Sequence, residues 1–250
     1  MKTMELINRF KAYIAEEKLF HPGDKVLLAV SGGVDSVVMA HLCKQAGIDC
    51  GIAHCNFQLR GAESSRDETF VTALANELGL PLYNIRFDTA TYAADKRISI
   101  QVAARELRYA WLEETRQQQG YAFLATAHHM QDNVETVLMN LAKGTGIAGL
   151  HGILPKQQHL IRPLLFAQKE DLLALAAANG WGYVEDSSNL TIKYTRNFFR
   201  HKVIPAIQEI YPAAVPQMAA SIDRFREAGQ LYTEAVSRHK KRLLFKQGAH

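Results

Sequence analysis

Short apolar runs alternate with amphipathic segments along the first half of the chain. The first run, Lys25–Val30, follows a Pro-Gly-Asp turn and has the length and apolar character of a buried strand. Later runs of the same character are Cys50–His54, Leu82–Phe87 and Tyr121–Thr126. The segments between these runs predict helices around Val37–Gln45, Arg66–Leu78 and Ser99–Gln118. Because strands that alternate with helices are typical of βαβ units, we predict an α/β fold with a doubly wound, mainly parallel sheet and ligands at the carboxyl ends of its strands.

Both ends of the chain carry helical patterns. Near the N-terminus the apolar residues at helical spacing are Leu6, Phe10, Tyr13 and Ile14. A glycine-rich connection begins at about Gly144. Towards the C-terminus one apolar stripe passes through Met218, Ile222, Phe225, Tyr232 and Val236, which predicts a long helix. We therefore predict an α/β domain over residues 1–210 and a small helical subdomain over residues 211–250.

Composition narrows the class of protein. No stretch approaches the roughly 20 apolar residues of a membrane span, and the acidic, amphipathic N-terminus is unlike a signal peptide, so we expect a cytoplasmic protein without membrane contact. The net charge of +4 suits a polyanionic partner but is also common elsewhere. Cys43, Cys50 and Cys55 form no C-x-x-C pair, which favours reduced, buried thiols. The sequence leaves both a monomer and an oligomer open.

The most informative segment follows the first predicted strand and precedes a helix; it consists of Ser31, Gly32, Gly33, Val34, Asp35 and Ser36. Glycines let a backbone approach phosphate closely, and the N–H groups that begin a helix attract it. We expect this loop to bind phosphate and Asp35 to hold Mg²⁺ beside it. A Walker A loop is excluded, because no Gly-Lys-Ser/Thr follows. The plainer alternative is a turn built from small residues.

A second polar group lies on the helix predicted after Thr126. Asp132, Glu135 and Thr136 are spaced i, i+3 and i+4, so they share one face. The opposite stripe of that helix, Val134, Val137, Leu138 and Leu141, is predicted to pack in the core. His128 and His129 precede the helix at the end of a strand, where we expect them to contact a nucleotide. The alternative is a solvated helix start whose acids only favour the helix dipole.

A third candidate is the pair Arg105 and Arg108 on one face of the helix over Ser99–Gln118. Arginine forks bind phosphate oxygens in bidentate fashion. Surface arginines in salt bridges are equally common, so the pattern alone leaves both interpretations open.

The loop Ser31–Ser36 resembles the PP-loop signature of the ATP-pyrophosphatase superfamily. Alone it does not choose among amide-forming synthetases, tRNA thiolases and lysidine synthetases. The stretches that together resemble the tRNA(Ile)-lysidine synthetase family are Ser31–Ser36, His54–Ser64, Ala103–Tyr109, His128–Thr136, Gly144–Leu150 and Arg162–Leu165. Asp186–Asn189, followed by Tyr194, Arg196, Asn197 and Arg200, resembles the same family. The likeness covers roughly residues 20–210.

The resemblance implies an ATP-dependent ligase with Mg²⁺, L-lysine and tRNA(Ile) bearing the anticodon CAU as its cofactors and partners. The wobble cytidine would be adenylated at its C2 oxygen with release of pyrophosphate, and lysine would then displace AMP. The resemblance implies catalytic roles for Asp35, Arg105, Asp132 and Glu135, of which the last two are candidates for recognising and activating lysine. It implies nucleotide binding by the loop with His54, Arg108, His128 and His129. Members of the family continue into C-terminal tRNA-binding domains, so we expect this chain to be the catalytic portion.

Two positions depart from the family pattern: Phe57 stands at a frequent histidine, and Gln131 replaces the first of two paired acids. A tRNA thiolase is the main alternative, but such enzymes rely on paired cysteines that are not spaced for this here. A module that binds nucleotide or tRNA without catalysis is another. The basic residues near the C-terminus suit either RNA phosphates or a hydrated helix surface.

Overall fold

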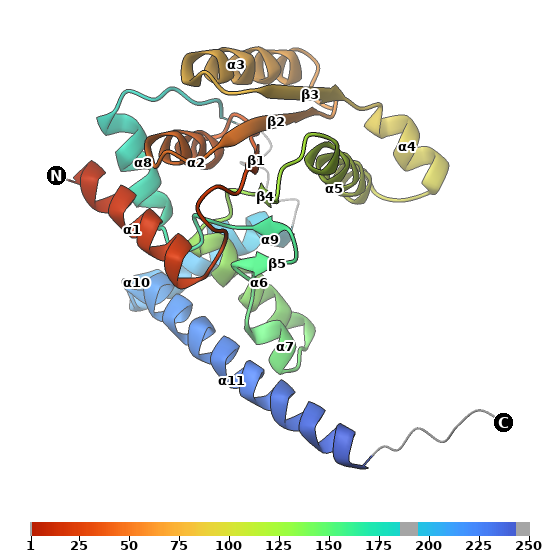
Figure 1. Ribbon diagram of the computed structural model, residues 1–250. Coiled ribbons are helices and arrows are strands. Elements are labelled where there is room, and N and C mark those ends of the chain that lie inside the picture. The colour runs from red at the N-terminus through yellow and green to blue at the C-terminus, as the bar shows by residue number, and fades with distance from the viewer. Residues whose placement is uncertain (1, 186–194, 244–250) are drawn as a thin grey trace. The chain divides into compact units, whose positions relative to one another are not determined.

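The computed structural model describes residues 2–185 and 195–243. The chain forms two compact units, and each is described by itself (Figure 1). The α/β unit comprises Met1–His129 and Pro155–Ser188, and the helical unit comprises Met130–Leu154 and Asn189–His250. The functional division into residues 1–210 and 211–250 stays a prediction. No helix among the described residues is long and apolar enough to cross a membrane.

The α/β unit is built on a six-stranded sheet with the order β3-β2-β1-β4-β6-β5. The strands are β1 (Val26–Ala29), β2 (Cys50–Asn56), β3 (Leu82–Arg86), β4 (Phe123–Ala125), β5 (Lys156–Gln157) and β6 (Leu160–Ile161). All neighbouring pairs are parallel except β5 and β6. The predicted parallel sheet and its four main strands are confirmed. Because β1 lies between β2 and β4, the strand order reverses at β1, and ligands bind open α/β sheets at such a point.

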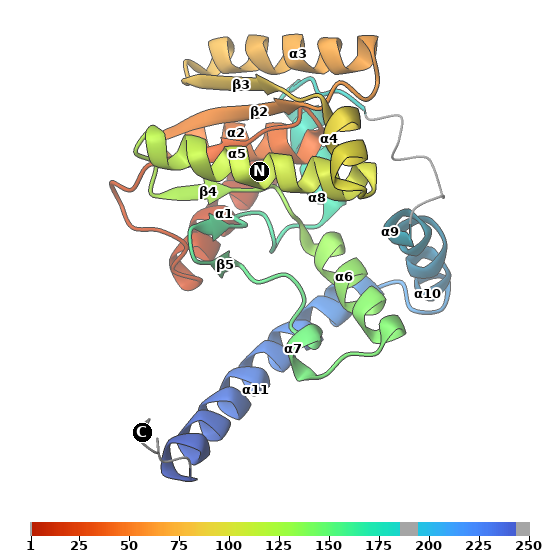
Figure 2. The ribbon, with the colours of Figure 1, turned by 90° about the vertical axis from the view of Figure 1, so that its right-hand side faces the viewer.

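Helices cover both faces of this sheet. They are α1 (Lys2–Glu16), α2 (Val34–Gln45), α3 (Ala62–Leu78), α4 (Thr89–Lys96), α5 (Ile100–Gln118) and α8 (Lys169–Ala178). Along β1, Leu28 faces a large core shared with α1, α2, α3 and α8, whereas Leu27 faces a smaller core with Leu112 of α5. Side chains alternate across a strand, so these cores lie on opposite faces. The doubly wound fold is therefore confirmed (Figure 2).

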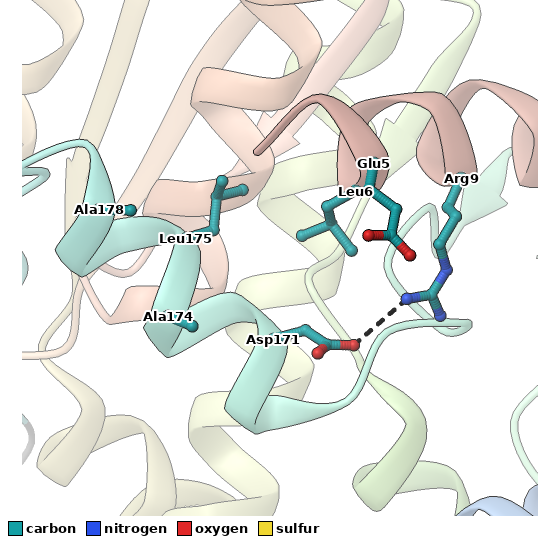
Figure 3. A pocket seen from close by; sticks show the side chains of 7 residues that line it. All are labelled: Glu5, Leu6, Arg9, Asp171, Ala174, Leu175 and Ala178. Atoms are coloured by element: carbon teal, nitrogen blue, oxygen red, sulfur yellow. Dashed lines mark hydrogen bonds and ion pairs between the residues drawn. The ribbon is translucent and has the colours of Figure 1, made fainter. Parts of the chain in front are cut away.

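The first helix of the chain packs on the last helix of the α/β unit. Figure 3 shows side chains of α1 and α8 lining a small pocket, with Leu6 and Leu175 among them. Arg9 Nη1 lies 3.4 Å from Asp171 Oδ2 across the same surface. The predicted amphipathic N-terminal helix is thus confirmed, because Leu6, Phe10 and Ile14 are buried.

The helical unit contains α6 (Met130–Lys143), α7 (Ile147–Leu150), α9 (Thr195–Phe198), α10 (Ile204–Ile210) and α11 (Ala214–Leu243), with a π-helical turn over Phe199–Val203. Its core joins Val134 and Val137 of α6 to Ile222 of α11. The prediction that Leu141 belongs to this core was wrong, since its side chain lies near the end of α6 and is 54% exposed. The long helix is confirmed, but the last buried residue of its stripe is Ile222, and Phe225 and Tyr232 beyond it are exposed.

Candidate functional site

The predicted phosphate loop connects β1 to α2 and is shaped by its own hydrogen bonds. Ser36 Oγ accepts hydrogen bonds from the backbone N–H groups of Ser31 and Gly32, both at 3.2 Å, and donates one to the Gly33 carbonyl at 2.8 Å. Gly32 has φ +95°, and a Cβ there would lie 2.7 Å from Val184 Cγ2, so only glycine fits. The helix cap at Gly33 has no side-chain hydrogen bond in the described chain. The start of α2 therefore presents its N–H groups and dipole without a competing side chain.

Asp35 lies in the first turn of α2 and is held by a lysine that the sequence did not single out. Lys169 Nζ, at the start of α8, lies 2.6 Å and 2.7 Å from the two carboxylate oxygens of Asp35. His129 Nε2 lies 3.8 Å from Asp35 Oδ2. The structure thus brings two predicted site residues, Asp35 and His129, together. Lys169 was missed because it follows no recognisable spacing relative to the loop.

The residues around Asp35 fit Mg²⁺ only as a metal that shares its ligands with phosphate. Among the described residues, no three His, Cys, Asp or Glu side chains cluster as metal ligands. Mg²⁺ is commonly held by one or two carboxylates together with the phosphates of a nucleotide. A single carboxylate beside a phosphate loop meets that requirement, so Asp35 suits the predicted role.

The two other predicted histidines have different surroundings. His54 is buried in β2, and its Nδ1 donates to the Val30 carbonyl, 2.8 Å away, directly before the loop. Burial lowers the pKa of His54, and the hydrogen bond to Val30 opposes this less strongly. His54 therefore fixes the end of β1, and its direct contact with nucleotide stays a prediction. His128 is half-buried, with Nδ1 2.9 Å from Thr126 Oγ1.

Arg105 and Arg108 of α5 flank one aromatic ring. Their guanidinium carbons lie 4.8 Å and 5.0 Å from the centroid of Tyr109. Arg162, which follows β6, is buried, and burial is the main reason that its pKa is lowered; the charge of Arg105 lowers it further, against the influence of Tyr109. Two arginines therefore flank Tyr109, and the charge of Arg105 also reaches Arg162, an arrangement of guanidinium groups suited to anions. Arg162 was visible in sequence only through the family stretch Arg162–Leu165.

The helical unit holds the predicted acidic pair in an ion-paired cluster. Arg200 bonds Glu135 with both fork nitrogens, Nε to Oε1 at 2.6 Å and Nη2 to Oε2 at 3.0 Å, and its Nη2 also donates to Asp132 Oδ1 at 2.9 Å. One guanidinium reaches both acids, which confirms that they share a face of α6. Arg196 Nη2 donates to Thr136 Oγ1 at 2.9 Å. Arg196 and Arg200 were visible in sequence only through the family resemblance.

Glu135 is fully buried, at 0% exposure. Burial raises its pKa, and the bonds and charge of Arg200 counteract that rise only in part. If Arg200 moved away, the buried carboxylate of Glu135 would be a strong site for a cationic ligand, because a buried charge needs a partner. The family-like residues Asp186–Asn189 and Tyr194 lie outside the described residues.

The α/β fold with a phosphate loop after its first strand defines a nucleotide-binding protein of the PP-loop class, and the PP-loop domain family matches residues 3–207. The tRNA(Ile)-lysidine synthase of Parabacteroides distasonis is 44% identical over 239 residues, which cover 96% of this chain and 55% of that protein. That of Chlorobaculum tepidum is 41% identical over 241 residues, covering 94% of this chain and 72% of that protein. The chain therefore belongs to the tRNA(Ile)-lysidine synthase family of PP-loop proteins.

A solved structure supports the fold alone. The U34-tRNA thiolase NcsA from Methanococcus maripaludis, with its [4Fe-4S] cluster, superposes with a TM-score of 0.71 at 19% identity, covering 88% of this chain and 78% of that one. The chain spans only about half of the length of the Parabacteroides relative, since the match covers 55% of that protein.

Proposed function

We propose that this protein converts the wobble cytidine of tRNA(Ile) with the anticodon CAU to lysidine, using ATP, Mg²⁺ and L-lysine, in the cytoplasm. The identity of 41% over 94% of the chain to a lysidine synthase carries this proposal. The paired acids Asp132 and Glu135 and the phosphate loop supply the chemistry that such a reaction needs. Because the chain spans 55% of the Parabacteroides relative, the whole activity is a proposal.

The first step of the proposed reaction activates the base. The C2 oxygen of cytidine attacks the α-phosphorus of ATP, pyrophosphate leaves, and the oxygen becomes part of a good leaving group. The loop amides, with Arg105 and Arg108, would neutralise charge that develops on the phosphates. Mg²⁺, bound by Asp35 and the phosphates, would supply further positive charge. His128 and His129 are proposed to contact the nucleotide from the end of β4.

The second step joins lysine to the activated base. The ε-ammonium of free lysine, with an ordinary pKa of about 10.4, must lose a proton before its nitrogen attacks carbon C2 and displaces AMP. We assign recognition of the cation to Asp132 and Glu135, with Glu135 serving mainly this step. Burial raises the pKa of Glu135, so its carboxylate is more basic than an exposed one and better able to accept that proton.

A tRNA thiolase is the second candidate, suggested by the fold of the Methanococcus enzyme. The three cysteines of this chain do not favour it. All three are free thiols, with Cys43 and Cys50 buried. Burial raises the pKa of Cys50 to about 11 and that of Cys55 to about 12, and raises that of Cys43 as well. Thiols that stay protonated are poor nucleophiles and poor iron ligands.

The direct test is incorporation of labelled L-lysine into a tRNA(Ile) transcript. We expect lysine to enter RNA that carries the CAU anticodon and not RNA in which the wobble cytidine is replaced by uridine. Uridine also has a C2 oxygen, but it carries an N3–H and a C4 oxygen where cytidine has an unprotonated N3 and an amino group. Equal labelling of both transcripts would refute the proposal. Sulfur transfer to the RNA in the absence of lysine would support the thiolase instead.

A further inference from the structure

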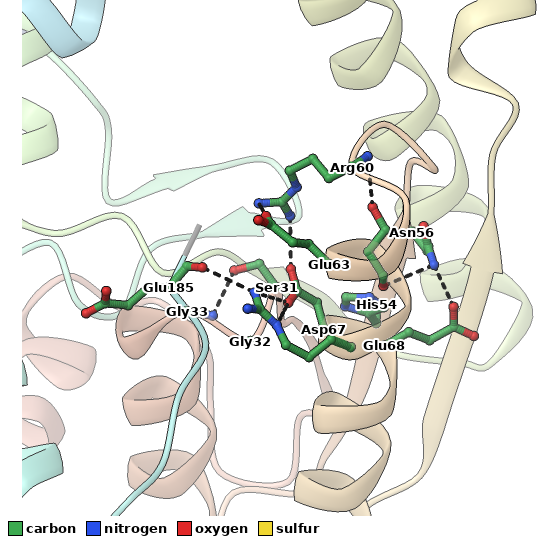
Figure 4. A network of polar contacts seen from close by, with 12 residues as sticks. Ser31, Gly32, Gly33, His54, Asn56, Arg60, Glu63, Asp67, Glu68 and Glu185 are labelled. Atoms are coloured by element: carbon green, nitrogen blue, oxygen red, sulfur yellow. Dashed lines mark hydrogen bonds and ion pairs between the residues drawn. The ribbon is translucent and has the colours of Figure 1, made fainter. Parts of the chain in front are cut away.

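The family-like stretch His54–Ser64 leads into a polar network beside the phosphate loop, and most of it has no role in the reaction above (Figure 4). Its centre is Asp67 of α3, which is 4% exposed. Arg60 Nη2 donates to Asp67 Oδ2 at 3.0 Å. Arg66 donates to the other oxygen, Oδ1, through Nε at 3.0 Å and Nη2 at 2.8 Å. Two guanidinium groups thus bind one buried carboxylate, and this carboxylate holds both of them in place.

Arg66 also reaches a distant part of the chain, Gly182–Glu185, which we name the 182–185 segment. Arg66 Nη2 donates to the Glu185 carbonyl at 3.3 Å. One residue earlier, the Val184 N–H donates to the Gly32 carbonyl at 3.0 Å. The 182–185 segment is therefore bonded to α3 on one side and to the phosphate loop on the other.

Close packing makes this arrangement specific to the loop. The side chain of Val184 occupies the space that a Cβ on Gly32 would need, at 2.7 Å, and Phe70 of α3 lies at 3.4 Å from the same point. Gly32 keeps its positive φ of +95° while its carbonyl is tied to Val184. If the 182–185 segment moved away, the Gly32 peptide would lose both its hydrogen bond and the packing that fix its orientation.

We propose that Arg66 is a positioning residue for the phosphate site: by holding the 182–185 segment against Gly32, it fixes the loop in the conformation that binds the pyrophosphate part of a nucleotide. A loop that is already ordered loses less conformational entropy when its ligand binds. Arg66 itself needs no contact with the ligand. The inference rests on the proposed function only for the identity of that ligand as ATP.

A matched control is Arg86, which pairs with Glu68 of α3. Arg86 Nε lies 2.9 Å from Glu68 Oε2 and its Nη2 lies 3.1 Å from Oε1, so this is also a two-pronged arginine–carboxylate pair. Arg86 and Arg66 are both well exposed, with side-chain exposures of 63% and 50%. Arg86 lies on β3 and pairs with Glu68, which belongs neither to the loop nor to the 182–185 segment. R86M therefore removes a similar ion pair without touching the loop.

The experiment measures binding of magnesium pyrophosphate to the whole chain by calorimetry, together with hydrogen exchange of the Val184 amide. We expect R66M to weaken pyrophosphate binding about fivefold, the equivalent of one net hydrogen bond, and to speed exchange at Val184. R86M should change neither. R66K keeps a charge beside Asp67, but its ammonium cannot serve both the carboxylate and the Glu185 carbonyl, so binding should weaken there too.

Two results would overturn the proposal. One is pyrophosphate binding by both R66M and R66K that matches R86M; the other is unchanged exchange at Val184 in R66M. Neither readout requires RNA or lysine. A chain that formed no lysidine could therefore still show the expected effect of R66M on pyrophosphate binding. Conversely, unchanged pyrophosphate binding in R66M would not argue against the proposed reaction.

Discussion

The ammonium of Lys169 contacts both carboxylate oxygens of Asp35, at 2.6 Å and 2.7 Å. The pair joins the start of α8 to the first turn of α2, where the phosphate loop ends. The loop carboxylate thus has a protein cation as its counter-ion. A metal ion that binds Asp35 must displace the Lys169 ammonium or share the carboxylate with it. A phosphate group, in contrast, would be attracted by the ammonium.

Replacing Lys169 should separate these two effects. K169Q leaves the charge of Asp35 uncompensated, so we expect Mg²⁺ to be needed at severalfold lower concentration and pyrophosphate without Mg²⁺ to bind severalfold more weakly. Calorimetric titrations of pyrophosphate at varied Mg²⁺ measure both. K156Q is a suitable control, because Lys156 Nζ donates to the Lys18 carbonyl rather than to the loop. An unchanged Mg²⁺ dependence in K169Q would show that Lys169 does not compete with the metal.

Asp35 itself can be tested by an amide of the same size. D35N removes the charge proposed to hold Mg²⁺ against the phosphates, so AMP formation should fall by at least about a hundredfold, comparable to removing a major electrostatic contact from a transition state. The melting temperature should stay close to that of the wild type, since Asp35 is only partly buried. Near-normal turnover would reduce Asp35 to a residue that only favours the start of α2.

The sequence predicted the sheet, the loop and the acidic face of α6, because each depends on local spacing. Alternation of apolar runs located β1 to β4, and i, i+3 spacing placed Asp132 with Glu135. Spacing carries no information about contacts between distant segments, which is why Lys169 beside Asp35 and Arg66 beside Glu185 went unseen. The prediction for Leu141 was wrong for the same reason. A helical stripe shows which face of the helix packs, but not how far along the helix its packing partner extends.

A substitution of Glu135 should distinguish the two proposed half-reactions. E135Q should still form adenylated tRNA but pass it slowly to lysine, with the lysine KM raised tens-fold or more and partial rescue at high lysine. The reason is that a cation in a partly desolvated pocket depends on carboxylate pairing for roughly 2 to 5 kcal/mol. Single-turnover formation of adenylated tRNA without lysine, followed by a lysine chase, measures each step.

Asp132 provides the comparison for that experiment. We expect D132N to impair both steps. The assay should be run well below the melting transition of each variant, because Glu135 also pairs with Arg200 in the fold. If E135Q lost adenylation as completely as D35N, the assignment of Glu135 to lysine would fail, and α6 would belong to the metal and nucleotide site.

His54 should make stability depend on pH. Burial lowers its pKa in the folded protein below the ordinary value of 6.5, so below that pH the unfolded chain binds a proton that the folded chain resists. The stability contributed by neutral His54 is therefore present above pH 6.5 and is lost as the pH falls towards the folded pKa. Melting temperatures of the wild type and H54N should diverge less at pH 5.5 than at pH 7.5, a range of about two units around an ordinary histidine pKa. A difference that did not change with pH would contradict a buried, neutral His54.

The proposed function requires that this chain couple ATP cleavage to the joining of lysine and tRNA. The most direct measurement is release of AMP from ATP by the wild-type chain, with L-lysine and tRNA(Ile) each present or omitted. We expect sustained AMP release only when both are present, and no more than a single turnover with tRNA alone. Sustained release without RNA, or at the same rate without lysine, would contradict it.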